Sequence, residues 1–343
     1  MVKIVDLAAG GFGSHQQKGD QMKAVLSLAV LLSMITGLAW GNDVLLQSNG
    51  LEREDGAYQL DIDLSGSLQN PAFSPDGSSI VLTRFRDGYN TGASDLFIYD
   101  LETGELKSLV ADGNSNVNLP GSVWNGTIDS VVFSSDGGSH DEIFLISEAG
   151  STGEEVRITN RVGQQSYEPA MSPDGQWIVF ESHDIDEETD VEANGVITKY
   201  SIDGSSGYIE LTASSDNCKQ PNWSPMGNRI LYQKVTNGEW AIWTMDINGR
   251  NKRMVTGLNE SGTDAVFSYN GQWIVYSSEN DSVDLANLYL TPAWGGVPIR
   301  ITTYEGYDGA PSMSPDGSRI VFESIDTDPD ASQGTAIWMV NIP

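Results

Sequence analysis

Two acidic segments of this chain place carboxylates at alternate positions, a spacing that can serve metal binding. They run Phe180-Glu181-Ser182-His183-Asp184-Ile185-Asp186 and Phe322-Glu323-Ser324-Ile325-Asp326-Thr327-Asp328-Pro329-Asp330. Alternate carboxylates in a loop can converge on Ca²⁺, a hard cation that takes roughly six to eight oxygen ligands. A solvated acidic loop is the alternative interpretation, because the glycine and the distal bidentate glutamate of known calcium loops are missing. The candidate calcium ligands are Asp184, Asp186, Asp326, Asp328 and Asp330.

A second set of polar side chains lies just ahead of a strand motif that recurs along the chain. In the fold that this motif predicts, these residues gather around the entrance of a central channel. One interpretation is that they only satisfy backbone groups at the ends of strands. The entrance residues are Asn70, Tyr167, Glu168, Lys219, Gln220, Asp264, Tyr307 and Asp308.

Catalytic chemistry has little support in the sequence. There is no Gly-x-Ser-x-Gly nucleophile elbow, and only His140 and His183 follow residue 41, too few for a multi-histidine metal centre. An acid–base pair of carboxylates is compatible with the 48 Asp and Glu residues, but nothing in the sequence selects one. Cys218 is the single cysteine, so no intramolecular disulfide forms, and we expect it to be buried. Catalytic residues are left unassigned, and no organic cofactor is expected.

The candidate residues are positioned by a motif that turns one strand into the next. It reads Pro71-Ala72-Phe73-Ser74-Pro75-Asp76-Gly77 and is followed by the apolar run Ile80-Val81-Leu82. Similar copies begin at Pro169, Pro221, Pro311 and, more loosely, Ala265. Proline presets a φ suited to the turn, Asp or Asn favours the turn itself, and Gly accepts a positive φ. Each copy therefore predicts two antiparallel strands joined by a tight turn.

The motif repeats at a nearly fixed period. In the second unit Asn125-Gly126 supplies the turn between strands at 122–124 and 128–134. The segment Phe133–Gly137 resembles the motif, but no second strand of the usual kind follows it. The turn glycines then fall at 77, 126, 175, 227, 271 and 317, with steps of 49, 49, 52, 44 and 46 residues. A period of this size, with strands and no helical pattern, predicts an all-β fold, a six-bladed β-propeller of four-stranded antiparallel blades.

The last unit needs a strand from elsewhere in the chain. Ala336–Ile342 is its third strand, and the chain then stops, which would leave an unpaired edge. Tyr58–Leu64 alternates apolar with polar residues, as a half-exposed outer strand should. We predict that this N-terminal strand completes the sixth blade and closes the ring.

The residues ahead of the propeller have the pattern of a secretory signal. Met22-Lys23 gives a basic start, residues 24–35 are apolar, and Gly37–Gly41 ends in small residues. We expect residues 1–41 to be a signal-peptide region with its true start at Met22 and cleavage after Gly41, 42–57 to be a short tail, and 58–343 to be the propeller. No other apolar run is long enough to span a membrane. The expected location is therefore the bacterial periplasm or the extracellular medium.

The charge of the chain restricts its partners. With 18 basic and 48 acidic residues the formal net charge is −30, so nucleic acid and anionic membrane surfaces are poor partners. Cations and basic protein surfaces are better ones. Solubility in a salty or extracellular medium is an equally good reason for the acidity.

The repeated Pro-x-Phe/Met/Trp-Ser-Pro-Asp-Gly phrase resembles the repeat of TolB-like propellers over about residues 58–343. TolB itself carries an α/β domain ahead of its propeller, and we expect this chain to lack that domain. The resemblance implies that the funnel face and channel receive extended segments of partner proteins, here an envelope or extracellular protein or peptide. It also implies that the eight entrance residues named above contact this partner. The expected function is thus a monomeric, non-catalytic binding scaffold, assisted by calcium if the acidic loops bind it. The alternative is a carbohydrate-active lyase or hydrolase, or a polysaccharide-binding module, on the same propeller.

Overall fold

The computed structural model describes residues 48–342 except 114, 119–122, 137–139, 148–153, 187, 190, 258–260, 283–284 and 326–333. The chain divides into residues 1–45 and residues 46–343, and only the second unit contains described residues. The expected signal region and its cleavage site therefore lie outside the described residues. Within the described part of the chain, no helix is long and apolar enough to cross a membrane.

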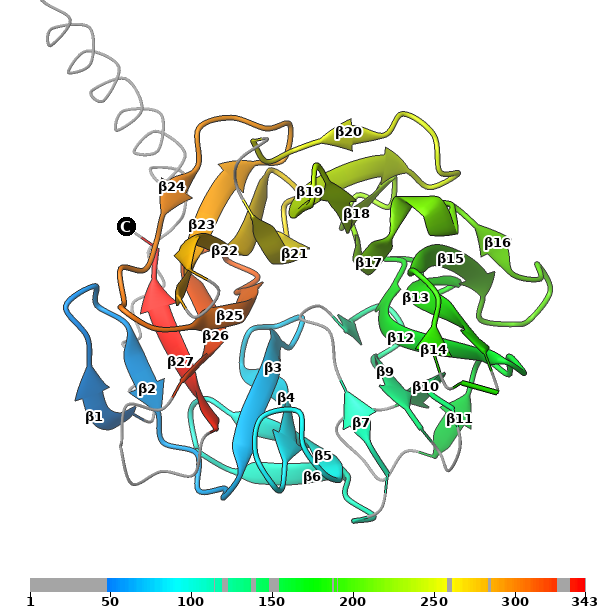
Figure 1. Ribbon diagram of the computed structural model, residues 1–343. Coiled ribbons are helices and arrows are strands. Elements are labelled where there is room, and N and C mark those ends of the chain that lie inside the picture. Colours follow the sequence, from blue (N-terminus) through cyan, green and yellow to red (C-terminus); the bar gives the residue numbers. More distant parts are fainter. Residues whose placement is uncertain are drawn as a thin grey trace, which may run out of the picture. The chain divides into compact units, whose positions relative to one another are not determined.

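Six antiparallel sheets stand around a central axis as the blades of a propeller (Figure 1). Blade one contains β3 (Ser67–Phe73), β4 (Ser79–Phe85), β5 (Ser94–Asp100) and β6 (Leu106–Val110). Blade two contains β7 (Val117–Asn118), β8 (Trp124–Asn125), β9 (Ser130–Ser135), β10 (Glu142–Ser147) and β11 (Glu155–Arg157). Blade three contains β12 (Gln164–Met171), β13 (Trp177–Asp186), β14 (Val191–Glu192), β15 (Val196–Ser201) and β16 (Ile209–Glu210).

The other half of the ring follows the same order. A short 3₁₀ turn, η1 (Ser214–Asp216), leads into blade four. Blade four contains β17 (Cys218–Trp223), β18 (Arg229–Thr236), β19 (Glu239–Asp246) and β20 (Arg253–Met254). Blade five contains β21 (Gly262–Phe267), β22 (Trp273–Ser282), β23 (Leu285–Pro292) and β24 (Ile299–Arg300). Blade six contains β25 (Asp308–Met313), β26 (Arg319–Ile325) and β27 (Thr335–Asn341), joined by β2 (Tyr58–Leu60) and β1 (Ser48–Glu52).

The ring is closed by the N-terminal strand, as the sequence predicted. β2 pairs antiparallel with β27, with Tyr58 opposite Met339, so blue and red strands share one blade in Figure 1. β1 adds a further strand outside β2, within the stretch for which the sequence indicated only a tail. In blade two the turn follows Asn125, and Phe133 lies inside β9, which confirms the register chosen at Asn125-Gly126.

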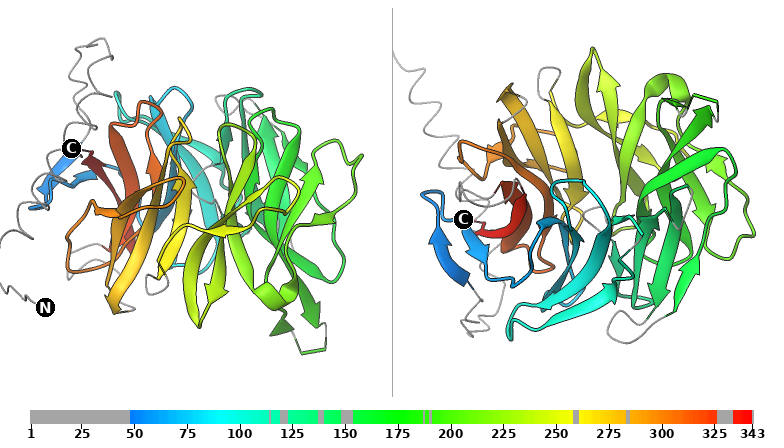
Figure 2. Two further views of the ribbon diagram at one scale, coloured as in Figure 1. Left: turned by 90° about the horizontal axis from the view of Figure 1, so that it is seen from above. Right: turned by 60° about the horizontal axis from the view of Figure 1, so that its bottom comes forward.

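The recurrent turn is held by the side chains that define the motif. In blade one, the Ser74 hydroxyl donates to Asp76 Oδ1 at 2.7 Å, and the Ser78 backbone N–H donates to the same oxygen at 3.0 Å. Gly77 has a φ of 75°, a conformation that favours glycine. The turn then feeds Ile80 and its neighbours into β4, where they are fully buried because adjacent blades cover both faces. Figure 2 shows that the strands of each blade run between the two ends of the axis.

Candidate binding site at the channel mouth

The innermost strands of five blades share an irregularity about midway along their length. The pairing register shifts there in β3, β12, β17, β21 and β25. At each shift a residue other than glycine takes a left-handed backbone, with φ between 44° and 52°. Such a conformation costs about 1 to 3 kcal/mol, and surrounding contacts must maintain it. These bulge residues are Asn70, Glu168, Gln220, Asp264 and Ala310.

Two bulge residues bond to equivalent glutamates of the preceding blades. Glu323 Oε2 accepts the backbone N–H of Asn70 at 2.8 Å, and Glu181 Oε2 accepts that of Gln220 at 3.1 Å. Both glutamates are nearly fully buried, with exposed fractions of 2% and 5%. They belong to the Phe-Glu-Ser pattern shared by blades three and six. Glu323 therefore links blade six to the innermost strand of blade one, and Glu181 links blade three to the innermost strand of blade four.

Two further bulge residues continue this belt of contacts. The Gln220 side-chain carbonyl accepts the backbone N–H of Asp264 at 3.2 Å, and Asp264 Oδ2 accepts that of Ala310 at 3.5 Å. The backbone N–H groups are available because the bulge takes them out of the regular ladder. These contacts link blades three, four, five, six and one around the axis, and the sequence singled out two of the linking side chains, Gln220 and Asp264, only as partner contacts.

The buried Glu323 carboxylate bonds to two tyrosines, the half-buried Tyr307 and the exposed Tyr89. The hydroxyls of Tyr89 and Tyr307 donate to Glu323 Oε1 at 3.1 and 3.3 Å, and their rings meet edge to face with centroids 6.2 Å apart. Burial raises the pKa of Glu323 to about 7 against the opposing effect of the Asn70 N–H, and the charge of Asp264 adds to the rise. Burial also raises the pKa of Tyr307 well above its usual range, so both tyrosines act as hydrogen-bond donors.

The corresponding cluster in blade three contains a pair of carboxyl groups. Glu168 lies beside Glu181, and Glu168 Oε1 accepts from Gln220 Nε2 at 3.0 Å. Burial raises the pKa of Glu168 well above its ordinary value, and the neighbouring Glu181 raises it further. Glu181 Oε1 contacts His183 Nε2, and His183 Nδ1 lies 2.7 Å from the Ala193 carbonyl oxygen. Burial therefore favours the protonated form of the Glu168 carboxyl.

A cavity of about 310 Å³ opens beside this carboxyl pair, and we name it the acidic mouth. Burial and the charge of Asp136 raise the pKa of Asp141, another lining residue, to about 7. The Lys219 ammonium lies 4.4 Å from the centroid of the Trp240 ring and supplies a positive charge. The polar residues that define the acidic mouth are Asn118, Asp141, Tyr167, Glu168, Glu181 and Lys219.

Most of the predicted partner-binding residues gather along the channel. Tyr167, Glu168 and Lys219 line the acidic mouth. Asn70, Gln220 and Asp264 line a smaller cleft of about 20 Å³ further along the inner strands. Tyr307 lies in the Glu323 cluster. Sequence reasoning missed Glu181, Asp141 and Tyr89, although the shared Phe-Glu-Ser pattern did point to the segment that contains Glu181.

Asp308 lies inside blade six, away from the acidic mouth. It is fully buried, and Arg53 Nη1 donates to its Oδ1 at 2.8 Å. The Arg53 guanidinium also lies between the rings of Tyr304 and Trp338, at 3.7 and 3.8 Å from their centroids. Burial raises the pKa of Asp308, although the charge of Arg53 opposes this. In this arrangement Asp308 holds Arg53 and presents no surface to a partner.

The candidate calcium ligands are only partly described. Asp184 accepts a hydrogen bond from Gln164 Nε2, and Asp186 Oδ1 accepts the backbone N–H of Glu188 at 3.0 Å. The other three candidates, Asp326, Asp328 and Asp330, lie outside the described residues. Across the described ranges, no group of three or more His, Cys, Asp or Glu side chains is arranged to hold a metal ion. Calcium binding by these loops stays a prediction.

Comparison with known proteins decides the family. The family model PD40, described as the TolB beta propeller domain, matches residues 54–261 and 196–331. The chain belongs to the TolB beta propeller family. Its relatives include the Tol-Pal system protein TolB of Francisella tularensis subsp. mediasiatica, which is 25% identical over 225 residues, or 62% of this chain and 48% of that protein. A putative tricorn-like protease C-terminal subunit of Sulfurisphaera tokodaii is 25% identical over 266 residues, or 73% of this chain and 27% of that protein.

This TolB-family chain spans less than half the length of those two curated relatives. Solved structures of similar fold include a putative TolB from Agrobacterium tumefaciens, with a TM-score of 0.55, 19% identity, and coverage of 80% of this chain and 90% of that chain. A gluconolactonase from Xanthomonas campestris gives a TM-score of 0.60 at 14% identity, with coverage of 84% and 90%. At these identities the likeness concerns the fold alone.

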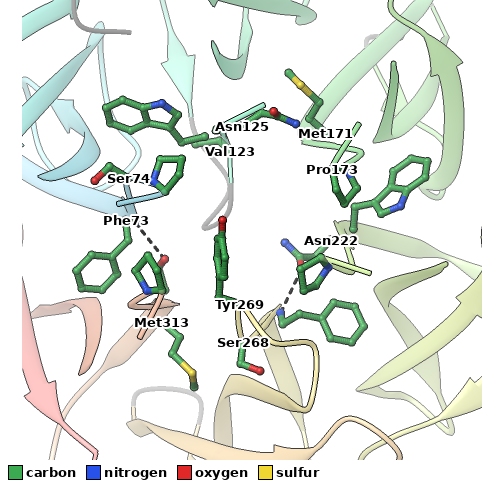
Figure 3. A pocket seen from close by; sticks show the side chains of 18 of the residues that line it. Phe73, Ser74, Val123, Asn125, Met171, Pro173, Asn222, Ser268, Tyr269 and Met313 are labelled. Atoms are coloured by element: carbon green, nitrogen blue, oxygen red, sulfur yellow. Dashed lines mark hydrogen bonds between the residues drawn. The ribbon is translucent and has the colours of Figure 1, made fainter. Parts of the chain in front are cut away.

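The opposite end of the TolB-family channel has a different chemistry. A cavity of about 470 Å³ opens there among the recurrent turns, and its described lining contains no charged side chain (Figure 3). Tyr269, which is 57% exposed, points into the middle of this opening in Figure 3. No binding site was predicted at this end, although its lining includes the prolines of the recurrent turn, Pro75, Pro173, Pro225 and Pro315. We name it the proline mouth.

Proposed function

We propose that this TolB-family propeller is a monomeric, non-catalytic scaffold that binds an extended segment of an envelope or extracellular protein at the acidic mouth. The observation that carries the proposal is the cavity of about 310 Å³ in which Tyr167, Glu168 and Lys219 converge. These side chains come from the innermost strands of two adjacent blades, β12 and β17, which the belt of bulge contacts holds in place. Preorganised polar groups of this kind bind a segment at a lower entropic cost than mobile loops do.

The charges around the cavity indicate what kind of segment fits. Among the described lining residues, the acidic side chains Asp141, Glu168 and Glu181 lie beside one cation, Lys219, and the whole chain carries a formal net charge of −30. A field of this sign attracts positively charged partners and speeds their association. We therefore expect a segment with basic side chains, whose backbone amides can bond to the Tyr167 and Asn118 side chains. The Tol-Pal name of the relatives supports a protein partner, and the proposed location is the periplasm or the extracellular medium.

Site-specific crosslinking tests this proposal. A photoreactive amino acid is placed at Tyr167 in the full chain, which is then irradiated in the envelope and culture fractions of the source cells. The matched control carries the same group at Tyr269, in the proline mouth. We expect one protein to crosslink from position 167, to be identified by mass spectrometry, and to be lost with Glu168→Lys. Repeating the reaction with calcium and with a chelator tests whether the cation assists binding.

Equal crosslinking from positions 167 and 269 would show that the acidic mouth has no special role. The absence of any protein product from position 167 would remove the scaffold as the leading function.

An enzyme is the second candidate, and the carboxyl pair favours it. Burial favours the protonated form of Glu168, which lies beside Glu181 in a cavity, and such a pair can provide a general acid and a general base. The fold is shared with an oligogalacturonate lyase at a TM-score of 0.55 and 16% identity. Incubation with acidic oligosaccharides tests this candidate: turnover that is lost in both Glu168→Gln and Glu181→Gln supports it. Unchanged turnover in both variants, or none in the wild type, contradicts it.

A further inference from the structure

Another cavity lies away from the channel, between blades four and five. Its volume is about 460 Å³, and it is lined by Arg229, Asn251, Arg253, Ala293 and Trp294. Arg253 belongs to β20, the outermost strand of blade four, and Trp294 follows β23 in the turn that leads to the outermost strand of blade five. We name this cavity the rim site. It shares no residue with the acidic mouth.

The rim site contains two arginines in an otherwise strongly acidic protein. Neither Arg229 nor Arg253 takes part in any ion pair found among the described residues. Arg253 Nη2 donates to the Ala293 carbonyl at 3.2 Å, which fixes its guanidinium between the two blades. Arg229 Nη2 donates to Thr244 Oγ1 at 2.5 Å, whereas its Nε is buried and has no hydrogen-bond partner in the described structure. The two guanidiniums therefore retain donors for an anion.

The acidic residue paired with Arg229 in the sheet is already engaged by its own turn. Asp246 lies opposite Arg229 in the ladder of β18 and β19. Its Oδ1 accepts the backbone N–H of Arg250 at 3.0 Å, and its Oδ2 accepts the Asn251 side-chain amide at 2.8 Å. Asp246 therefore partly offsets the positive charge of Arg229, but its oxygens do not occupy the N–H groups of the two arginines.

An exposed aromatic surface completes the rim site. The Trp294 side chain is 64% exposed, which is unusual for so large an apolar group on a soluble domain. It sits on a tight turn, in which the Gly295 N–H donates to the Pro292 carbonyl at 2.8 Å and Gly295 has a φ of 85°. This turn fixes the main chain beneath the indole. A flat, rigid apolar surface next to fixed cations is the arrangement that binds a ring bearing an anionic group.

We propose that the rim site binds a carboxylate carried on a flat-faced ring. The ring lies on the Trp294 indole, and the carboxylate is held by Arg253 and Arg229, because the planar guanidinium matches a carboxylate in shape and charge. A ligand with a single carboxylate is favoured over a polyanion, since the net charge of −30 repels multiply charged molecules. Sugar acids and aromatic acids share this chemistry. The proposal is independent of what binds at the acidic mouth.

Direct titration tests the rim site and distinguishes the two sources. Glucuronate represents the sugar acids, benzoate represents the aromatic acids, and glucose lacks the carboxylate. We expect saturable, salt-sensitive binding of at least one acid by the full chain, measured by calorimetry, with no binding of glucose. Arg253→Gln and Trp294→Ala should each weaken binding at least tenfold. The matched control is Arg300→Gln, an exposed arginine on β24, the outermost strand of blade five, and it should bind as the wild type does.

Neither substituted side chain is buried, so both variants are expected to fold, and unfolding curves check this directly. The proposal is overturned if neither acid saturates the wild-type protein, or if Arg253→Gln and Trp294→Ala both bind as tightly as Arg300→Gln.

Discussion

At neutral pH the Glu323 carboxyl is about half protonated, because burial raises its pKa to about 7. In the unfolded chain the same group ionises near its ordinary value of 4.5. The folded state therefore binds the proton more tightly, and the free energy of unfolding falls as pH rises from 4.5 to about 7, after which this contribution is constant. The pKa difference corresponds to a loss of up to about 3 kcal/mol.

Glu323→Gln tests this pH dependence. The amide cannot ionise, and it still offers an oxygen to the Asn70 N–H and an NH₂ group to the tyrosine hydroxyls. We expect the stability of the variant relative to the wild type to rise by about 3 kcal/mol between pH 4.5 and pH 8, measured by urea unfolding at several pH values. Asp141, whose pKa is also raised to about 7, keeps its own contribution in both proteins.

Glu239→Gln, at an exposed position of β19, is the control for loss of a negative charge. Its unfolding free energy should run parallel to that of the wild type over the same pH range. A parallel curve for Glu323→Gln would show instead that the Glu323 carboxyl titrates normally in the folded protein.

At the scale of the elements, the recurrent turn depends on one side-chain acceptor. Asp76 Oδ1 accepts from the Ser74 hydroxyl at 2.7 Å and from the Ser78 N–H at 3.0 Å. In blade five Asn270 takes this place and accepts the Ser268 hydroxyl at 2.8 Å. Asp76→Ala should therefore cost about 1 kcal/mol in the free energy of unfolding, whereas Asp76→Asn should cost less than half as much. Urea unfolding at pH 7 measures both, and equal costs would show that the acceptor oxygen is unimportant.

The sequence predicted the turns and blades well because their chemistry is local. Pro, Asp or Asn, and Gly occur at fixed offsets in each unit, and even the atypical second unit was placed by Asn125-Gly126. The left-handed bulges were not predicted. Left-handed backbone is normally signalled by Gly or Asn, but here Glu168, Gln220, Asp264 and Ala310 adopt it. Their conformation is set by contacts between blades, which no local pattern records.

At the scale of the whole molecule, closure depends on residues far apart in the chain. The sequence predicted the closing strand from its alternation and from the bare edge of blade six. It gave no sign that Arg53 would reach Asp308, a residue 255 positions away. Asp308 was therefore expected at the mouth with its neighbour Tyr307, because position in a loop was the only criterion. A buried ion pair between distant segments becomes visible only when the ring is assembled.

Arg53 fixes the N-terminal segment to blade six, so its removal should weaken closure of the ring. Arg53→Met retains much of the apolar contact with Tyr304 and Trp338 but leaves Asp308 buried without its cation. Breaking a buried pair in this way typically costs about 3 to 5 kcal/mol, mostly through the uncompensated charge. We therefore expect Arg53→Met to lower the free energy of unfolding by that amount at pH 7. Adding Asp308→Asn should recover at least half of the loss, because the second change removes the stranded charge. If the double variant is no more stable than Arg53→Met in urea unfolding, the ring is held by the Arg53 contacts with Ser324 and the aromatic rings, and the ion pair contributes little.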